Sequence, residues 1–247
     1  MNIAVLGCGR LFEHYSRQAF KYMPKDWSIN LLIDNNEDAL MLAHSKFPKA
    51  VLRNSIETAD KDLQAIKLAF IFSPSGLHYE HAKKLIKKGI SVVIEKPICM
   101  RQDQIAEIYR FALEHKCEVF PVFQNRFNKA LCFAKEVVQK GWLGKLVTVS
   151  TNVRWHRTEE YYNSSTWRGT WKYDGGVINN QAIHHIDAYV WLVGAPKTVY
   201  TINRHILHNI ECEDTSISLM QNNDGSTGLF TATTTTPFED LEASIEL

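Results

Sequence analysis

The first half of the chain alternates short, continuously apolar runs with longer amphipathic stretches. The apolar runs are IAVLG (3–7), INLLID (29–34), LAFIFS (68–73), SVVIEK (91–96) and CEVFPV (117–122). Because these runs lack polar alternation, they predict strands that are buried on both faces. Between them lie amphipathic segments at 11–22, 36–47, 76–89 and 102–116. This alternation of strand and helix predicts a parallel sheet with helices on both sides.

The pattern changes beyond residue 122. A predicted helix (126–140) ends at Gly141 and is followed by strand-like runs at 146–155, 197–206, 213–222 and 227–236, with one helix near 177–193. Successive strands without intervening helices predict a mainly antiparallel sheet. We therefore predict an α/β chain with two domains, a Rossmann-type domain at 1–121 and an α+β domain at 122–247. The sequence ends at SIEL, inside a strand-like run, which leaves open whether the second domain is truncated.

Composition and charge narrow the range of partners. Hydrophobic residues make up 45% of the 247 residues and charged residues 22%, and the formal net charge is +1. These values are typical of a soluble globular protein, and they give no reason to expect a nucleic acid or a membrane surface as partner. No apolar run approaches the roughly 20 residues needed to span a bilayer. The sequence opens with a predicted strand, MNIAVLG, so we expect no signal peptide.

Cysteine and histidine usage gives no sign of a metal. The five cysteines include no CxxC pair, which argues against a disulfide framework and a zinc site. It favours a reducing, cytoplasmic compartment instead. The spacing of His205-x-x-His208 is compatible with two metal ligands, but two surface histidines are the simpler interpretation.

A nucleotide site is predicted at the end of the first strand. Gly7-x-Gly9 follows that strand and precedes a helix, so the backbone can turn tightly and a phosphate can face the helix N-terminus. The third glycine of the full motif is replaced by Phe12, which keeps a plain strand-to-helix turn as an alternative. Asp34, at the end of the second strand, is placed to bond the ribose hydroxyls and favours NAD over NADP. The alternative for Asp34 is a helix cap.

Two further strand ends carry candidate chemistry. Ser73-Pro74-Ser75-Gly76, with His78 close behind, lies where parallel sheets bind ligands. Glu95-Lys96-Pro97 follows the strand at 91–96. Burial and nearby positive charge can lower the pKa of such a lysine, which could then move a proton or bond a substrate hydroxyl. An ordinary Glu-Lys pair at a strand end is the alternative.

Together these residues resemble a known family. GCGR, Asp34, SPSGLH, EKP, QNRFN (124–128) and GGVINNQAIHHID (175–187) are similar, in order and spacing, to the Gfo/Idh/MocA oxidoreductases. The resemblance covers essentially the whole chain. It implies a Rossmann domain, an open-faced second domain, a nicotinamide cofactor and a sugar or cyclitol substrate. It also implies homodimers or homotetramers formed through the second sheet.

The resemblance gives a role to the polar residues of the predicted helix at 177–193. On an α-helix, Asn180, His184 and Asp187 would share one face, whereas His184 and His185 would point about 100° apart. The family pattern has an Asp four residues before its functional His, so His184 takes that role and Asn180 replaces the Asp. Since an amide cannot act as a base, proton transfer is expected to fall to Lys96 and His184.

The resemblance supplies three sets of expected site residues. The catalytic set is Lys96, Asn180 and His184. The NAD-binding set is Gly7, Gly9, Arg10, Leu11, Asp34, Ser73, Pro74, Ser75, His78, Glu95, Lys96, Gln124, Trp167 and Arg168. The substrate-binding set is Lys96, Asn125, Arg126, Arg154, Arg157, Asn180, Gln181 and His184, with the arginines available for bidentate bonds to a diphosphate or carboxylate.

The strings NNQAIHHID and WRGTWKYDGG (167–176) look most like UDP-N-acetylglucosaminuronate 3-dehydrogenases of bacterial surface polysaccharide and lipopolysaccharide biosynthesis. Three alternatives remain open at this point. The first is an inositol or free-sugar dehydrogenase of the same family, and the second is a NAD-assisted glycoside hydrolase. The third is a non-catalytic NAD-binding protein, which the missing Asp and the abrupt C-terminus would suit.

Overall fold

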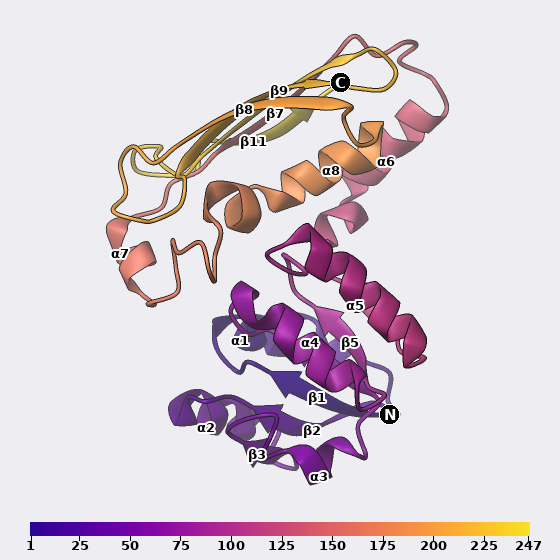
Figure 1. Ribbon diagram of the computed structural model, residues 1–247, viewed down its shortest axis with the longest axis vertical. Coiled ribbons are helices and arrows are strands. Elements are labelled where there is room, and N and C mark those ends of the chain that lie inside the picture. The colour runs from indigo at the N-terminus through magenta and orange to yellow at the C-terminus, as the bar shows by residue number, and fades with distance from the viewer. The chain divides into compact units, whose positions relative to one another are not determined.

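The computed structural model describes residues 1–247, which form two compact units, Met1–Val122 and Phe123–Leu247 (Figure 1). The division falls one residue beyond the one expected from the sequence. No helix in either unit has both the length and the apolar character required to cross a bilayer.

The first unit is built on a parallel sheet of six strands in the order β3-β2-β1-β4-β5-β6. The strands are β1 (Asn2–Leu6), β2 (Ser28–Ile33), β3 (Val51–Arg53), β4 (Leu68–Ile71), β5 (Ser91–Ile94) and β6 (Val119–Pro121). This order is that of dinucleotide-binding folds, in which ligands lie beyond the carboxyl ends of the strands. The parallel sheet is as predicted. Strand β3 was not, because three residues are too few to give a pattern.

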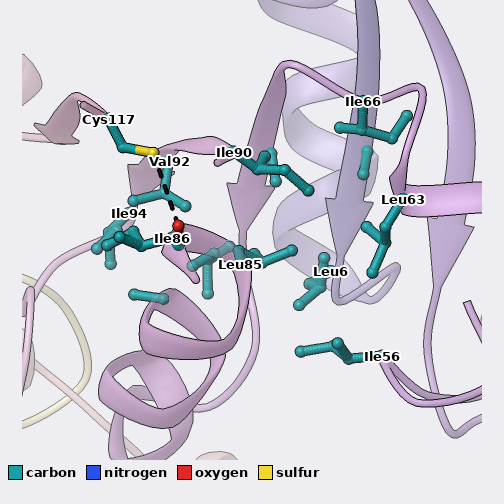
Figure 2. Close-up of a cluster of buried hydrophobic side chains, with 14 of the residues drawn as sticks. Leu6, Ile56, Leu63, Ile66, Leu85, Ile86, Ile90, Val92, Ile94 and Cys117 are labelled. Carbon is teal, nitrogen blue, oxygen red and sulfur yellow. Dashed lines mark hydrogen bonds between the residues drawn. The ribbon is translucent and has the colours of Figure 1, made fainter. Parts of the chain in front are cut away.

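Helices cover both faces of this sheet. They are α1 (Arg10–Gln18), α2 (Glu37–Lys46), α3 (Asp60–Leu63), α4 (His78–Ile86) and α5 (Gln102–Glu114), with single turns η1 (Phe20–Tyr22) and η2 (Ser75–Leu77). Ile3 of β1 belongs to the core that holds Phe12 of α1. Leu6 belongs to the opposite core with Leu85 and Ile86 of α4 (Figure 2). Each buried side chain of this size contributes about 1.5–3 kcal/mol, which explains why the central strands carry apolar residues on both faces.

The second unit is built on a five-stranded sheet in the order β11-β7-β10-β9-β8. The strands are β7 (Thr148–Arg154), β8 (Thr198–Arg204), β9 (Thr215–Gln221), β10 (Thr227–Thr233) and β11 (Glu242–Glu246). All neighbouring pairs are antiparallel except β10 with β7. The helical elements are η3 (Gln124–Phe127), α6 (Lys129–Gln139), α7 (Glu159–Asn163), the π-helix η4 (Val177–Gln181) and α8 (Ile183–Val193). The mainly antiparallel sheet is as predicted.

The two faces of this sheet differ. One packs against η4 and α8 through a core that includes Val153, Val177 and Phe230. The opposite face, which we call the open sheet face, carries exposed apolar side chains. They stand opposite one another on neighbouring strands: Tyr200, Ile202, Ile217, Leu219 and Leu229.

Candidate functional site

The turn after β1 is shaped by two glycines with different requirements. Gly7 has a φ of +92°, and a Cβ there would lie 2.6 Å from the carbonyl carbon of Phe72, so only glycine fits. Gly9 is the N-cap of α1, and a Cβ there would meet no protein atom within 4 Å. No side chain caps this end of α1. The N–H groups of the first helical turn, beginning at Arg10 and Leu11, therefore suit an anionic group such as a dinucleotide phosphate.

Asp34 fastens this turn to the end of β2. Its carboxylate accepts hydrogen bonds from the backbone N–H of Cys8 at 2.6 Å and of Asn36 at 2.9 Å. The cap of α2 is Asn36, whose side chain accepts from Ala39 N–H, so the helix-cap interpretation of Asp34 is wrong. Each carboxylate oxygen has a second lone pair, which suits the ribose hydroxyl of a dinucleotide.

The Glu95-Lys96-Pro97 segment is held by α1. The buried Glu95 carboxylate accepts from the Tyr15 hydroxyl at 2.7 Å and from Lys96 N–H at 3.1 Å. Burial and the charge of Glu95 raise the pKa of Tyr15, so Tyr15 remains a protonated donor. Both carboxylate oxygens of Glu95 thus serve the protein, and Glu95 shapes the segment that carries the half-buried Lys96. No sequence pattern singled out Tyr15.

The structure corrects the role expected for His78. Its ring is 1% exposed, with Nδ1 2.7 Å from the Pro97 carbonyl oxygen and Nε2 2.8 Å from that of Ser73. Burial lowers the pKa of His78, although these contacts with carbonyl oxygens oppose the shift. Because both ring nitrogens face backbone oxygens, His78 joins the 73–75 turn to the EKP segment and does not offer a nitrogen to a cofactor.

Ser73 is held from the other side by α4, since its hydroxyl lies 2.9 Å from His81 Nδ1. Burial lowers the pKa of His81 to about 4, so the ring is neutral at physiological pH. Pro74 and Ser75 then lead into the short turn η2. The predicted turn at this strand end is therefore fixed by two histidines on one helix.

In the second unit, four of the predicted residues form a cluster around Tyr161. Its hydroxyl accepts from Arg168 Nη1 at 2.6 Å and from Gln181 Nε2 at 2.8 Å. Arg157 Nε in turn donates to Gln181 Oε1 at 3.1 Å. The guanidinium carbon of Arg168 lies 4.2 Å from the centre of the Tyr161 ring and 4.6 Å from that of Trp167. We call these five residues the Tyr161 cluster.

Tyr161 received no individual role from the sequence, because α7, the five-residue helix that carries it, was not predicted. A signal was present: Thr158 accepts from Tyr161 N–H as the N-cap, and Glu159 and Glu160 occupy the first turn. A capping threonine followed by acids is typical of a helix start. The helix is too short to show an amphipathic period.

The predicted continuous helix at 177–193 is wrong. Residues 177–181 form a π-helix and α8 starts only at Ile183. Asn180 and His184 therefore do not share a face by α-helical spacing. The turn before the π-helix requires Gly176, whose φ is +70° and where a Cβ would lie 2.4 Å from a Glu213 carboxylate oxygen. Glu213 Oε1 accepts from Ile178 N–H at 3.0 Å and so holds the first turn.

Asn180 is bound to a buried acid. Its side-chain amide donates to Asp174 Oδ1, and Asp174 Oδ2 accepts from Gly169 N–H at 2.7 Å. Asp174 is 2% exposed. The carboxylate therefore links the segment after Arg168 to the π-helix. Asp174 lies in the WRGTWKYDGG string, but the sequence alone assigned it no role.

The adjacent histidines have different surroundings, in keeping with their expected separation. His184 Nε2 lies 3.4 Å from Gln124 Nε2, and its ring meets Phe123 edge-on at 6.1 Å. Gln124 belongs to η3, as does Asn125. The His185 ring instead packs edge-on against Trp155 at 5.6 Å, and burial lowers its pKa.

Two arginines expected to bind the substrate form ion pairs within the second unit. Arg126 makes a bidentate pair with Asp187, at 2.8 and 2.6 Å. Arg154 lies 3.5 Å from Glu242, on the exposed surface of β7. Both partners are carboxylates distant in sequence, which could not be matched to these arginines in advance, so a bond from either arginine to the substrate would compete with an ion pair inside the protein. No cluster of three or more His, Cys, Asp or Glu residues has a metal-binding arrangement.

Two family models match successive parts of the chain. One, described as an oxidoreductase family with an NAD-binding Rossmann fold, matches residues 1–123. The other, described as the GFO/IDH/MocA C-terminal domain, matches residues 133–247. The first unit is accordingly an NAD-binding Rossmann domain, as predicted.

Similar proteins have been solved with cofactor and ligand. The chain is 31% identical to the WlbA dehydrogenase of Chromobacterium violaceum, in complex with NADH and UDP-GlcNAcA, with a TM-score of 0.93 over 99% of this chain and 70% of that one. WlbA from Bordetella pertussis, with the same two ligands, gives the same values. The scyllo-inositol 2-dehydrogenase (NADP+) IolW of Bacillus subtilis is 30% identical over 62% of this chain and 42% of its own length. The chain spans about half the length of the curated relatives it matches.

Proposed function

We propose a function for this chain from one premise: it belongs to the Gfo/Idh/MocA family of oxidoreductases, and its first unit binds NAD. The reaction we propose is oxidation of a secondary alcohol at C3 of UDP-N-acetylglucosaminuronic acid, or of a close relative, in the synthesis of bacterial surface polysaccharide such as lipopolysaccharide. The similarity to WlbA supports this choice.

The Tyr161 cluster is the observation that carries the proposal. Two guanidinium groups lie over one tyrosine ring, with Arg157 at 5.5 Å and Arg168 at 4.2 Å from its centre. Arg157 has a partly exposed partner in Asp240, but Arg168 has no carboxylate within ion-pair distance, and its Nε is buried without a hydrogen-bond partner. A cationic, partly buried cluster of this kind suits two anionic groups, the cofactor diphosphate at Arg168 and the carboxylate of a uronate at Arg157. A neutral sugar has no need of the second guanidinium.

We assign the remaining roles by chemistry. Bound NAD supplies the acceptor for the hydride. Lys96, or alternatively His184, takes the hydroxyl proton, and Asn180 and Gln181 orient sugar hydroxyls. Gln124 of η3 lies beside His184, and Asn125 follows it in the same turn. The glycine turn with Arg10 and Leu11, the 73–75 turn, Trp167 and Arg168 hold the cofactor, Asp34 selects NAD, and Arg157 meets the substrate carboxylate.

A substrate panel tests this proposal. NADH formation is followed in single turnover with UDP-N-acetylglucosaminuronic acid, UDP-N-acetylglucosamine and myo-inositol. The first should be preferred, and Arg157→Lys should reduce the preference for the carboxylate about 10-fold by loss of the planar fork. Arg168→Lys should weaken NAD binding, and exposed Arg110→Lys is the matched control. Oxidation of myo-inositol in preference to both nucleotides would favour the inositol dehydrogenase, an alternative that the match to IolW supports.

We also propose that the chain acts in the cytoplasm as a homodimer or homotetramer joined through the open sheet face. Exposed apolar residues such as Tyr200 (73%) and Leu219 (55%) stand opposite one another there, and contiguous apolar patches of this kind mark interaction surfaces. Tyr200→Glu together with Leu219→Glu should give a monomer in sedimentation. An unchanged assembly would exclude this face.

A further inference from the structure

Asp174 joins two parts of the second unit through one buried carboxylate. Its Oδ2 accepts from the N–H of Gly169, the residue after Arg168, at 2.7 Å, and its Oδ1 accepts from the Asn180 side-chain amide. At 2% exposure the carboxylate is shielded from water. Both contacts are therefore expected to be stronger than the same bonds at the surface.

The carboxylate dictates how Asn180 is presented. A carboxylate only accepts hydrogen bonds, whereas a side-chain amide donates from nitrogen and accepts at oxygen. The Asn180 nitrogen must therefore face Asp174, and its carbonyl oxygen lies on the opposite edge of the planar amide. We propose that Asp174 is a positioning residue that fixes Asn180 as a hydrogen-bond acceptor for a sugar hydroxyl. This inference rests on the proposed function, which places Asn180 at the substrate.

The same contact explains why an amide at position 180 suits this chain. A carboxylate at 180 would touch the buried Asp174, and two carboxylates in contact there cannot both be ionised without a large cost in free energy. The charge that the family pattern has at position 180 is here located at position 174. Asp174 and Asn180 thus form a carboxylate–amide pair, and the two residue types can be exchanged between the positions.

Three variants test the pair: Asp174→Asn, Asn180→Asp and the double exchange. In Asp174→Asn the new amide must use its oxygen for Gly169 N–H and its nitrogen for Asn180, which turns the Asn180 amide over. We expect kcat/KM for the nucleotide sugar to fall about 10- to 100-fold, the value of one hydrogen bond to a charged group, with NAD affinity within about 2-fold. Asn180→Asp should be less stable, because of the two adjoining carboxylates.

The double exchange is the decisive variant. The amide at 174 then accepts from Gly169 N–H and donates to the carboxylate at 180, which again offers an acceptor oxygen to the sugar. We expect kcat/KM to recover to within about 5-fold of the parent, since every hydrogen bond is restored. Exposed Asp26→Asn is the matched control. A double variant no better than Asp174→Asn, or Asp174→Asn with unchanged kcat/KM, would overturn the proposal.

A second readout works without turnover, so that failure of the proposed function stays distinguishable. In protein labelled with ¹⁵N-asparagine, Asn180→Ser identifies the Asn180 side-chain amide signal. Bound to Asp174, this amide should exchange with solvent much more slowly than exposed asparagines, and Asp174→Asn should accelerate it at least 10-fold. Fast exchange in the parent would overturn the proposal even if the enzyme is active. Slow exchange without activity on nucleotide sugars would leave the orientation intact and refute the substrate.

Discussion

Alanine substitutions at the two glycines after β1 should affect different properties, folding at Gly7 and cofactor binding at Gly9. Gly7 is required by the protein's own packing, whereas Gly9 has open space where its Cβ would be. Gly7→Ala should therefore damage the fold. Gly9→Ala should leave the fold intact and fill the space intended for a dinucleotide phosphate.

The magnitudes follow from the geometry. At Gly7 the positive φ costs about 1–2 kcal/mol, and the added overlap, 2.6 Å from a Phe72 backbone atom, cannot be relieved by a side-chain rotation. We expect the free energy of unfolding to fall by more than about 3 kcal/mol. At Gly9, with φ −79° and ψ −149°, the backbone cost should be about 1 kcal/mol. Loss of one hydrogen bond from a backbone N–H to a phosphate oxygen there should raise the Kd for NAD about 10- to 100-fold.

Thermal unfolding without cofactor and calorimetric titration with NAD measure the two effects. The expected result is a crossed pattern. Gly7→Ala unfolds well below the parent, whereas Gly9→Ala unfolds close to the parent and binds NAD weakly. If Gly9→Ala binds NAD as tightly as the parent, the dinucleotide phosphate does not lie on this turn, and the N-terminus of α1 is not its binding site.

Three further predictions concern buried and cofactor-facing acids. Burial, with the charges of Asp174 and Asp214, raises the pKa of Glu213 above its ordinary 4.5. The stability that Glu213 contributes is therefore complete below pH 4.5 and is lost as the pH rises through the raised pKa. In Glu213→Gln, which cannot ionise, the melting temperature should depend less on pH above 4.5 than it does in the parent. Burial alone would raise the pKa of Asp214, but hydrogen bonds from the N–H groups of residues 206–208 outweigh it and hold the pKa below 3.8. That contribution is lost on acidification below 3.8, and Asp214→Ala should cost about 3–5 kcal/mol at pH 7 by denaturant titration, by leaving those donors without an acceptor. Asp34→Asn should reduce the preference for NAD over NADP about 10-fold in competitive titrations, because it removes the charge that repels a 2′-phosphate.

The nucleotide-binding half could be predicted from the sequence because the features that mark it lie within short continuous segments. Strands buried on both faces need apolar residues throughout, and the glycine turn and Asp34 follow directly at strand ends. The supporting contacts could not be predicted in the same way. Tyr15 with Glu95, and His78 with Pro97, join positions far apart in the sequence, and their partners depend on how α1 and α4 pack.

The second unit shows where periodicity misleads. Helical spacing of four residues placed Asn180 with His184, but residues 177–181 form a π-helix, which has a wider turn, and the turn before it requires Gly176 beside Glu213. Arg126 and Arg154 looked available because Asp187 and Glu242 lie far away in sequence. The hydrogen bonds of Asp174 and Tyr161 join residues from separate segments, so the sequence alone could not assign partners to either of them.

The central claim is that this chain is an NAD-dependent dehydrogenase in which Lys96 takes part in proton transfer. The most direct measurement is single-turnover NADH formation, followed by absorbance, with enzyme in excess over UDP-N-acetylglucosaminuronic acid and NAD present. The parent should form about one NADH per sugar. Lys96→Met should still bind NAD and should form NADH at least about 100-fold more slowly, as expected for loss of a general base. Equal rates in the two proteins would contradict the role of Lys96, and NAD binding without any NADH in the parent would contradict the dehydrogenase for this sugar.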